Sequence, residues 1–456
     1  MPPKDCAQCP TLFWTVMTSI CIDGFNLALS RGSGIATYGR NLLEVVRDMG
    51  AETQVLYGPA QVHKGSHVVN EALLIDPERP PEKLSRRQKS RRFRSTLMSR
   101  FGRRAVPIIP SGEVIWPGDA GGRPAADRFW AATDLFRLSQ RCFEAYGRTT
   151  PLTFEETLEA SAPDIMHWTA HLPVYAKGRP NVVTIHDLIP LRLPHTTLDN
   201  KARYRALSLE AARRADHIVV VSETTRQDVV RLLNVDESRV TNTYQAVALP
   251  PSLTSRSQSD VTVELEGVFN LGWKSYFLHY GAIEPKKNLG RIVEAYLASG
   301  SETPLVIVGG RAWLDERETA LLHQVKRDGG PNADRIRQYQ YMPLSLLISL
   351  VRGAKATLFP SLYEGFGLPV LESMALATAV LTSTGGALPE VAGDAALLVD
   401  PYDVQAMTRG IRALDHDAGL RIQLESRGLM QVRQFDQAAY KARLATAYAA
   451  VGFDLG

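Results

Sequence analysis

Two series of alternating strands and helices set the strongest limit on how this 456-residue chain can fold. In the first series, the apolar run FWTVMTSICI precedes a glycine-containing loop and a stretch with apolar residues at helical spacing, IATYGRNLLEVVRDMG. In the second series, YFLHYG, PLVIVGG and ATLFP are each followed by a loop and a helical pattern. This order is typical of parallel sheets covered by helices. The sequence therefore predicts an α/β protein with two Rossmann-like domains that face each other across a cleft.

Changes in composition predict the domain limits. Residues 1–11 are expected to form a flexible tail, and residues 12–260 the first domain. Within it, about 60–160 fits the alternation poorly and is rich in Pro and Gly towards its end, which indicates an insertion. The polar, turn-rich sequence around residues 250–270 predicts the boundary, so the second domain covers residues 261–434.

The overall composition favours a globular protein of a reducing compartment. No window approaches the roughly 18 uninterrupted apolar residues of a membrane-spanning helix, and MPPKDCAQCP does not look like a secretory signal. Four cysteines in so long a chain do not indicate a disulfide framework. Cys6 and Cys9 form a lone C-x-x-C without further ligands, so no metal site is expected there. These features predict a cytoplasmic protein.

The net charge of +4 arises from one basic stretch. Residues 83–104 contain ten Lys or Arg residues and no Asp or Glu. Phe93, Leu97 and Phe101 recur every four residues with Met98 beside them, so on a helix they would form an apolar stripe flanked by arginines. That pattern is typical of a helix lying on an anionic membrane. A solvated loop is the main alternative, and binding to nucleic acid is not expected.

The stretch SLYEGFGLPVLESMA follows a predicted strand and combines several ligand-binding features. Glu364 lies in the loop, and Glu372 about one turn into a helix that Pro369 can begin. Gly365 and Gly367 allow a close approach of the backbone, and the helix N-terminus favours an anion such as a phosphate. Carboxylates bind vicinal hydroxyls well. Two carboxylates with a phosphate site between them therefore match a nucleotide sugar, which carries a hydroxylated ring on each side of its diphosphate. On spacing alone, a surface loop with a glutamate at a helix start remains an alternative.

This stretch resembles the E-x(7)-E signature of glycosyltransferase family 4, whose members are retaining enzymes with the GT-B fold. Other stretches resemble further motifs of that family in the same order: GSGIATYGRNLL, VVTIHDLIPL, VVVSETTRQDVVRLL, YGAIEPKKNLGRIVEAY and LPEVAGDAALLVDP. The resemblance covers most of residues 20–430 except the insertion. It implies that the first domain binds the acceptor and the second the nucleotide sugar, and that a helix within 435–456 packs back on the first domain.

The resemblance also implies roles for individual residues. Glu364 is expected to hold hydroxyls of the donor sugar, and Glu372 those of the ribose. Lys287 is expected at the diphosphate together with Lys286, because Ala282 stands where many relatives carry an arginine. Further donor contacts are expected from the backbone of Gly365, Phe366, Gly367 and Leu368, and from the first loop at Gly32 and Gly34.

The expected catalytic residues are His186, Glu364 and Lys287. His186 ends a predicted strand and is expected to face the cleft near the reacting sugar. The resemblance favours a front-face mechanism, in which the acceptor hydroxyl attacks on the side from which the diphosphate leaves and the leaving phosphate takes its proton. The protein then mainly positions the reactants and stabilises charge. No metal is expected, because the sequence shows no cluster of metal ligands and the lysines with the helix dipole can stabilise the diphosphate. No cofactor is expected, because the nucleotide sugar is a substrate.

Two residue pairs have weaker support. Asp23 and Gly24 follow the first strand and could line the acceptor side, although an Asx-type turn explains them equally well. Tyr341 and Met342 end a strand of the second domain where relatives commonly bracket the nucleobase.

The resulting prediction is a retaining hexosyltransferase, with GDP-mannose as the first expected donor. The acceptor would be a glycan or a polyprenyl-diphosphate-linked oligosaccharide in the synthesis of lipopolysaccharide or exopolysaccharide, at the inner face of the plasma membrane. The alternatives are a nucleotide-sugar epimerase or a non-catalytic glycan-binding protein on the same fold. A dehydrogenase is disfavoured, since the first loop lacks the last Gly or Ala of G-x-G-x-x-G/A.

Overall fold

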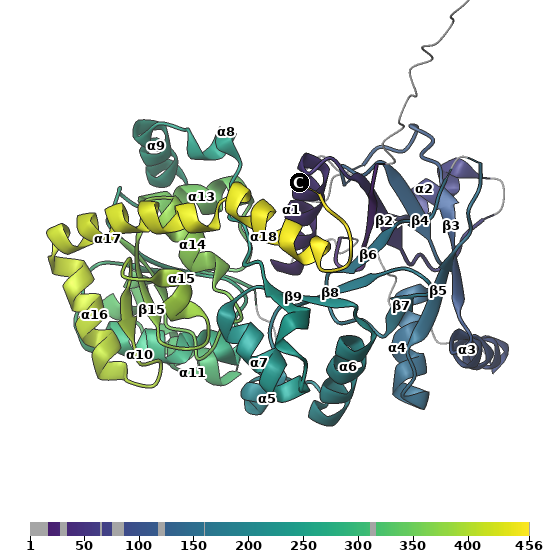
Figure 1. Ribbon diagram of the computed structural model, residues 1–456. Helices are drawn as coiled ribbons and strands as arrows, with labels where there is room; N and C mark the ends of the chain where they lie inside the picture. Colours follow the sequence, from purple (N-terminus) through teal and green to yellow (C-terminus); the bar gives the residue numbers. More distant parts are fainter. Residues whose placement is uncertain are drawn as a thin grey trace, which may run out of the picture.

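The computed structural model shows two α/β domains joined along one chain (Figure 1). It describes residues 17–27, 34–63, 66–74, 86–116, 124–158, 160–310 and 316–455. Cys6, Cys9 and Gly32 lie outside these ranges, as does the whole of the predicted tail, residues 1–11. No helix among the described residues is both long enough and apolar enough to cross a membrane.

The first domain is built on a ten-stranded sheet in the order β10-β9-β8-β6-β1-β2-β4-β3-β5-β7. Neighbouring strands run parallel except β3 and β4, which are antiparallel. The strands are β1 (Ser19–Asp23), β2 (Glu52–Tyr57), β3 (Arg103–Ile108), β4 (Arg128–Ala131), β5 (Thr150–Phe154), β6 (Ile165–Trp168), β7 (Val174–Ala176), β8 (Asn181–Ile185), β9 (His217–Val220) and β10 (Val240–Asn242). The helices are α1 (Gly34–Asp48), α2 (His67–Leu74), α3 (Arg86–Ser99), α4 (Leu135–Tyr146), α5 (Ile189–Arg192), α6 (Lys201–Arg214) and α7 (Glu223–Leu233).

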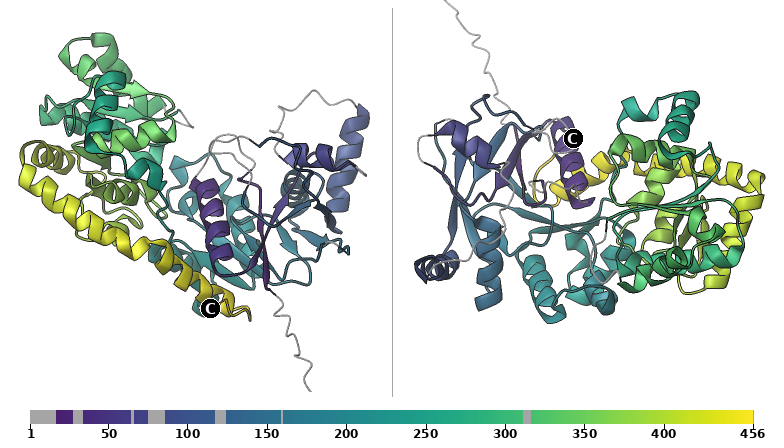
Figure 2. Two further views of the ribbon diagram at one scale, coloured as in Figure 1. Left: turned by 90° about the horizontal axis from the view of Figure 1, so that it is seen from above. Right: turned by 180° about the vertical axis from the view of Figure 1, so that it is seen from behind.

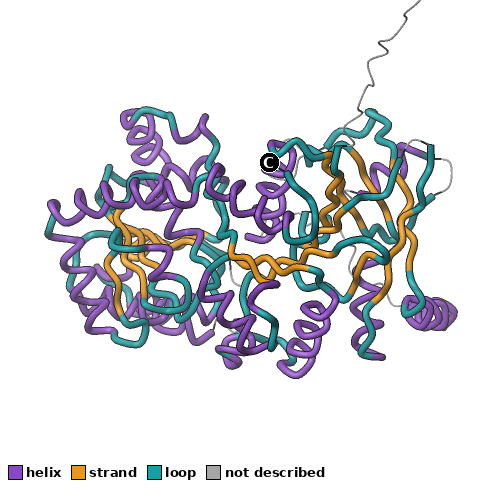
Figure 3. The backbone as a smooth tube through the Cα atoms, viewed as in Figure 1, coloured by secondary structure: helices purple, strands orange, loops and turns teal. Residues whose placement is uncertain are grey.

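The central strands of this sheet are buried on both faces. Every residue of β1, β6, β8 and β9 is buried, which is typical of parallel strands covered by helices on each side. Figure 3 shows the strands inside each domain and the helices around them. The carboxyl ends of these strands therefore supply the edge at which ligands of such sheets bind.

Residues 60–160, predicted as an insertion, are built into this sheet. They contribute β3, β4 and β5, and β4 pairs in parallel with β2. The strands are short, β3 begins with two arginines, and prolines and glycines separate the elements. For these reasons the alternation of strands and helices was not visible in the sequence.

The second domain has a six-stranded parallel sheet in the order β13-β12-β11-β14-β15-β16. Counted along the chain, this is the Rossmann order 3-2-1-4-5-6, which changes direction between β11 and β14. The strands are β11 (Phe277–Tyr280), β12 (Leu305–Val308), β13 (Ile336–Tyr339), β14 (Ala356–Phe359), β15 (Ala379–Ser383) and β16 (Leu397–Val399). The helices that follow the first domain are α8 (Pro251–Thr254), α9 (Gln258–Phe269), α10 (Leu289–Ser299), α11 (Glu316–Asp328), α12 (Pro331–Arg335), α13 (Leu344–Gly353), α14 (Leu368–Ala375), α15 (Leu388–Ala392), α16 (Val404–His416), α17 (Ala418–Gln431) and α18 (Gln437–Ala449).

The predicted boundary between residues 260 and 261 falls inside α9. The Ser257 hydroxyl caps this helix by accepting the Asp260 N–H at 3.1 Å. Val261 and Leu265 are buried, and α9 packs against α13 of the second domain. The second domain therefore begins before this helix. The sequence did not predict the helix, because the residues on its outer side are polar.

The last helix, α18, lies against the first domain, and α17 precedes it on the second (Figure 2). Helix α18 packs on α1, β9 and β10. The Tyr448 hydroxyl lies 2.8 Å from Nδ1 of His167 in β6, and both side chains are buried. The C-terminal segment thus ties the two domains together.

Candidate active site

The loops that follow β11 and β14 meet where the second sheet changes direction. The Leu362 N–H donates a hydrogen bond of 2.7 Å to the Lys286 carbonyl, which joins the two loops. The Asn288 side-chain amide donates to the carbonyls of Pro360 and Pro401 at 2.9 and 2.7 Å. These bonds fix the backbone on both sides of the site, so side chains from two distant stretches are held together.

Glu364 lies between two lysines at this point. Its Oε1 is 2.7 Å from Nζ of Lys287, and its Oε2 is 3.8 Å from Nζ of Lys286. Only 8% of Glu364 is exposed. Burial acts to raise the pKa of Glu364, but the two ammonium groups outweigh burial and lower the pKa below its ordinary value. The carboxylate is therefore charged at neutral pH and can accept hydrogen bonds from hydroxyls.

Lys286 supplies a firmly charged cation beside this carboxylate. Burial acts to lower the pKa of Lys286, but the charges of Glu364, Asp187 and Glu284 outweigh it and raise the pKa. Nζ of Lys286 lies 3.5 Å from Glu284, which is itself buried. The site thus combines two ammonium groups with the Glu364 carboxylate. These charges suit a ligand in which a phosphate group is attached to a hydroxylated ring.

Glu372 reaches the same region from α14. The Tyr280 hydroxyl, at the end of β11, donates to Glu372 Oε2 at 3.2 Å. Burial raises the pKa of Glu372, against the opposing effects of Tyr280 and Lys287. Among the described residues, Oε1 of Glu372 has no hydrogen-bond partner, so it can still bind a ligand.

Gly365 permits a close contact between the two domains. A Cβ atom at this position would overlap the His186 carbonyl oxygen at the end of β8. The sequence indicated that Gly365 lets the backbone approach a ligand, whereas in the structure it lets the backbone approach the first domain. Gly367 has φ +105 and precedes α14, a conformation that favours glycine. Phe366 is buried between them, and Leu368 is the first residue of α14.

His186 lies at this contact in a fixed orientation. Its Nε2 is 2.8 Å from the Thr169 carbonyl oxygen, so Nε2 carries the hydrogen and Nδ1 has a free lone pair. Its ring packs edge-on against Tyr38, with the ring centroids 4.8 Å apart. Burial lowers the pKa of His186, although Thr169 and Asp187 oppose this effect. The imidazole is therefore neutral at physiological pH and can accept a hydrogen bond from a hydroxyl.

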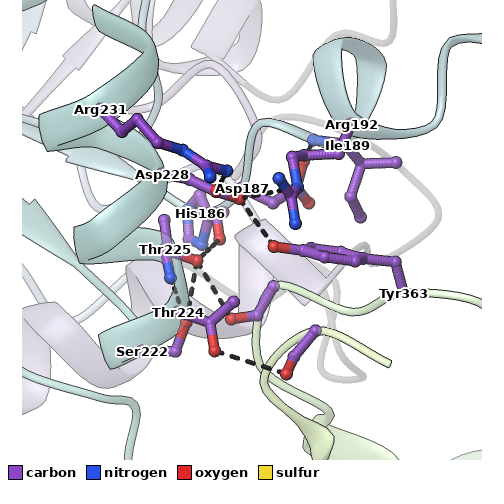
Figure 4. A network of polar contacts seen from close by, with 12 residues as sticks. His186, Asp187, Ile189, Arg192, Ser222, Thr224, Thr225, Asp228, Arg231 and Tyr363 are labelled. Atoms are coloured by element: carbon purple, nitrogen blue, oxygen red, sulfur yellow. Dashed lines mark hydrogen bonds and ion pairs between the residues drawn. The ribbon is translucent and has the colours of Figure 1, made fainter. Parts of the chain in front are cut away.

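Side chains of α7 bind the loop of the second domain (Figure 4). The Thr225 hydroxyl lies 3.2 Å from the His186 carbonyl oxygen and 3.3 Å from that of Gly365. The Tyr363 hydroxyl donates to Asp228 at 2.6 Å, and Arg192 lies 3.6 Å from the same carboxylate. These contacts hold the Glu364 loop against the end of β8.

Glu390 forms a second link between the domains. Its carboxylate accepts the N–H groups of Glu223 and Thr224, each at 2.9 Å, and therefore caps the first turn of α7. The Tyr244 hydroxyl lies 3.3 Å from the same group. The sequence predicted Ser222 as the cap, and Ser222 does accept the Thr225 N–H at 3.0 Å. No local pattern could have revealed the second cap, because Glu390 lies 166 residues from Thr224.

Other predicted residues lie outside this arrangement. Asp23 is fully buried, and its carboxylate accepts the N–H groups of Phe25 and Thr169. It forms the Asx-type turn and fixes the start of the loop after β6, so the structure does not support an acceptor contact. The neighbouring Gly24 packs against the Tyr57 ring, where a side chain would clash. Gly34 begins α1 with open space beside it, and its predicted contact with the donor phosphates stays a prediction.

Tyr341 and Met342 follow β13, two strands away from β11. Tyr341 is 78% exposed, and Met342 packs against the apolar core. Neither forms a hydrogen bond or ring contact with the described residues of the site, so their predicted contact with a nucleobase stays a prediction.

Solved structures share the whole two-domain arrangement. A sucrose-phosphate synthase from Thermosynechococcus elongatus is similar with a TM-score of 0.63 and 17% identity, covering 95% of this chain and 99% of that one. The Anabaena protein HepE, solved in complex with UDP, gives a TM-score of 0.61 and 13% identity over 95% of this chain and all of that one. At such identities the likeness concerns the fold alone, and the fold is that of GT-B glycosyltransferases.

Sequence comparisons then identify the family. Residues 113–249 match the model of "Glycosyltransferase Family 4", and residues 269–429 match that of "Glycosyl transferases group 1". The chain belongs to glycosyltransferase family 4. It is 34% identical over 259 residues to O-antigen chain mannosyltransferase B of Escherichia coli, and 28% identical over 294 residues to the serotype-specific mannosyltransferase WbdA of the same species. The alignments cover 56% and 61% of this chain but only 66% and 36% of those relatives.

The cap on α7 gives a direct test of the contact between domains. Replacing Glu390 by Ala removes the acceptor of two backbone N–H groups, so we expect a loss of about 1–2 kcal/mol in stability. Urea unfolding followed by tryptophan fluorescence measures this loss. Glu302, an exposed glutamate in an ion pair with Arg335, provides the control, because Glu302→Ala should unfold close to the wild type. Equal midpoints for Glu390→Ala and the wild type would contradict the capping role.

Proposed function

We propose that this protein is a retaining, metal-independent mannosyltransferase that uses GDP-mannose to extend a surface polysaccharide. The observation that carries the proposal is the charged Glu364 held between Lys286 and Lys287 at the switch point of the second sheet. Nucleotide ligands of Rossmann-like sheets bind at this point. The choice of mannose rests on the two relatives, which are both named as mannosyltransferases, one of them for the O-antigen chain.

In this proposal each side chain acts on a defined part of the donor. The ammonium groups of Lys286 and Lys287 and the N-terminus of α14 bind the diphosphate and stabilise its charge as it leaves. Glu364 accepts hydrogen bonds from the mannose hydroxyls, and Glu372 from those of the ribose. Backbone N–H groups at the start of α14 complete the donor site.

The reaction proceeds on one face of the mannose ring. The acceptor hydroxyl attacks the anomeric carbon on the side from which the diphosphate departs, and the leaving phosphate oxygen takes the hydroxyl proton. His186 lies beside Gly365 and offers the lone pair of Nδ1 to a sugar hydroxyl, which helps to orient the ring. The neutral imidazole and the paired carboxylate thus position the reactants, which is how we expect the protein to accelerate the transfer.

The transfer itself is the first test of the proposal. Wild-type protein with GDP-mannose and a mannose disaccharide on an octyl aglycone should form a trisaccharide with an α-linked terminal mannose, detected by mass spectrometry and proton NMR. In Glu364→Gln the neutral amide does not neutralise the charge of the two lysines, and it accepts hydrogen bonds from the sugar hydroxyls less well than the carboxylate does. The value of kcat/KM should therefore fall at least about 100-fold. Glu302→Gln serves as the control and should retain activity.

Three results would contradict the proposal. One is turnover in Glu364→Gln at the wild-type rate. Another is a β-linked product. A third is the conversion of GDP-mannose in the absence of any acceptor to an isomeric nucleotide sugar, which would indicate an epimerase.

We further propose that α3 places the enzyme on an anionic membrane, where a polyprenyl-diphosphate-linked acceptor would be presented. Phe93 and Met98 on α3 are 65% and 51% exposed, and Phe101 is 67% exposed with the Arg100 guanidinium 4.5 Å above its ring. The helix ends at Ser99, so Phe101 lies in the turn that follows rather than on the predicted helical stripe. Exposed apolar side chains among arginines suit the boundary between lipid headgroups and acyl chains.

Substitution of these exposed side chains tests membrane binding without disturbing the sheet, to which Arg103 and Arg104 belong. Phe93→Ser combined with Phe101→Ser should weaken binding to vesicles of phosphatidylglycerol and phosphatidylethanolamine at least about tenfold, because the apolar contribution is lost. Ile422→Ser is the matched control, since Ile422 is 66% exposed on α17. Flotation assays at low salt measure the binding. Unchanged binding of the double variant would refute the membrane role.

A further inference from the structure

His171 lies at the carboxyl edge of the first sheet, next to the candidate active site. It follows β6, which pairs with β1 on one side and β8 on the other. The chain between β6 and His171 is fixed at Thr169, whose N–H is bound by Asp23 and whose carbonyl is bound by His186. Since β8 ends at Ile185, directly before His186, both histidines lie at the same edge. His171 belongs to none of the motifs that the sequence revealed.

The ring of His171 is held in place without the use of its nitrogens. It packs edge-on against Tyr204 of α6, with the ring centroids 5.0 Å apart and an angle of 86°. The Tyr204 hydroxyl donates to the Asp187 carbonyl at 3.1 Å, so the supporting ring is itself fixed to the loop after β8. Neither nitrogen of His171 has a hydrogen-bond partner in the part of the chain that the structure describes.

Other histidines of this sheet use their nitrogens within the fold. His167 binds Tyr448 and Thr184, each at 2.8 Å, and His217 binds Thr241 at 2.7 Å. His171 is half-buried, so its ring is positioned by packing while its nitrogens stay available to a ligand. An oriented polar side chain without a protein partner at a ligand-binding edge is the expected state of a binding residue before its ligand arrives.

The electrostatic surroundings define what His171 can bind. Burial lowers the pKa of His171 to about 4, although Asp187 and Asp199 act to raise it. The neutral ring has one nitrogen that donates a hydrogen bond and one that accepts. That pair matches the hydroxyl groups of a sugar, each of which can both donate and accept.

We propose that His171 binds the terminal sugar of the acceptor, with one ring nitrogen donating a hydrogen bond to a sugar hydroxyl and the other accepting one, and with the Tyr204 ring as its support. The inference rests on the proposed function, because it assigns the acceptor side of the same transfer. His171 and His186 then hold the acceptor and the donor sugar, respectively, at neighbouring positions on the edge formed by β6 and β8.

Steady-state kinetics with the octyl mannose disaccharide and GDP-mannose test this assignment. His171→Phe keeps a ring against Tyr204 but removes both nitrogens, so KM for the disaccharide should rise at least about tenfold. KM for GDP-mannose and the affinity for GDP should stay within about twofold of the wild type, because the donor is bound by the second domain. His171→Asn, which restores one donor and one acceptor, should recover part of the acceptor affinity. His195→Phe, at an exposed histidine of the same domain, is the control and should behave as the wild type.

The possible results separate this inference from the proposed function. An unchanged KM for the disaccharide in His171→Phe, with active wild-type enzyme, would overturn the role of His171 alone. An equal rise in both KM values, or no recovery in His171→Asn, would indicate a purely structural role and would also overturn it. A wild-type enzyme that forms no product would contradict the proposed function itself, whereas tight binding of GDP would still support a donor site.

Discussion

The buried ion pairs between Glu364 and the lysines at 286 and 287 are the interaction on which the site depends. A buried carboxylate is costly unless it is paired, and the loss of one partner leaves an uncompensated charge. The pairing requires that the loops after β11 and β14 meet, which the parallel Rossmann order brings about. In the proposed function, the lysines and Glu364 release each other to bind the phosphates and hydroxyls of the donor, so the charge balance of the free protein prepares the site.

The first domain meets this site through a glycine contact and polar links, beside an apolar cluster in which Tyr244 packs against Phe366. Gly365 brings the Glu364 loop against the end of β8, and Thr225 bonds to both sides of that contact. Glu390 adds a carboxylate to the first turn of α7, where backbone N–H groups would otherwise lack partners. The polar links and the aromatic contact together hold the Glu364 loop against the first domain.

The sequence predicted those features that depend on local patterns. The alternation of strands and helices predicted the second sheet and the central strands of the first, and the stretch from Glu364 to Glu372 predicted a loop and helix start that the structure places beside Lys287. Features that depend on contacts between distant residues were missed or misjudged. Glu390 is bonded to α7 across the domains, Asp23 is buried by the loop after β6, and α9 is fixed by its contact with α13. No periodicity or spacing within the chain encodes these contacts.

We propose that the lysines and Glu364 at the switch point form the binding site of a nucleoside diphosphate sugar. Isothermal titration calorimetry of the wild type and of Lys287→Ala with GDP, UDP and ADP tests this proposal. We expect GDP to bind to the wild type more tightly than the other two nucleotides, and to bind to Lys287→Ala at least about tenfold more weakly, because a cation at the diphosphate is lost. Equal affinity of wild type and variant for GDP, or no binding of any of the three nucleotides, would contradict it.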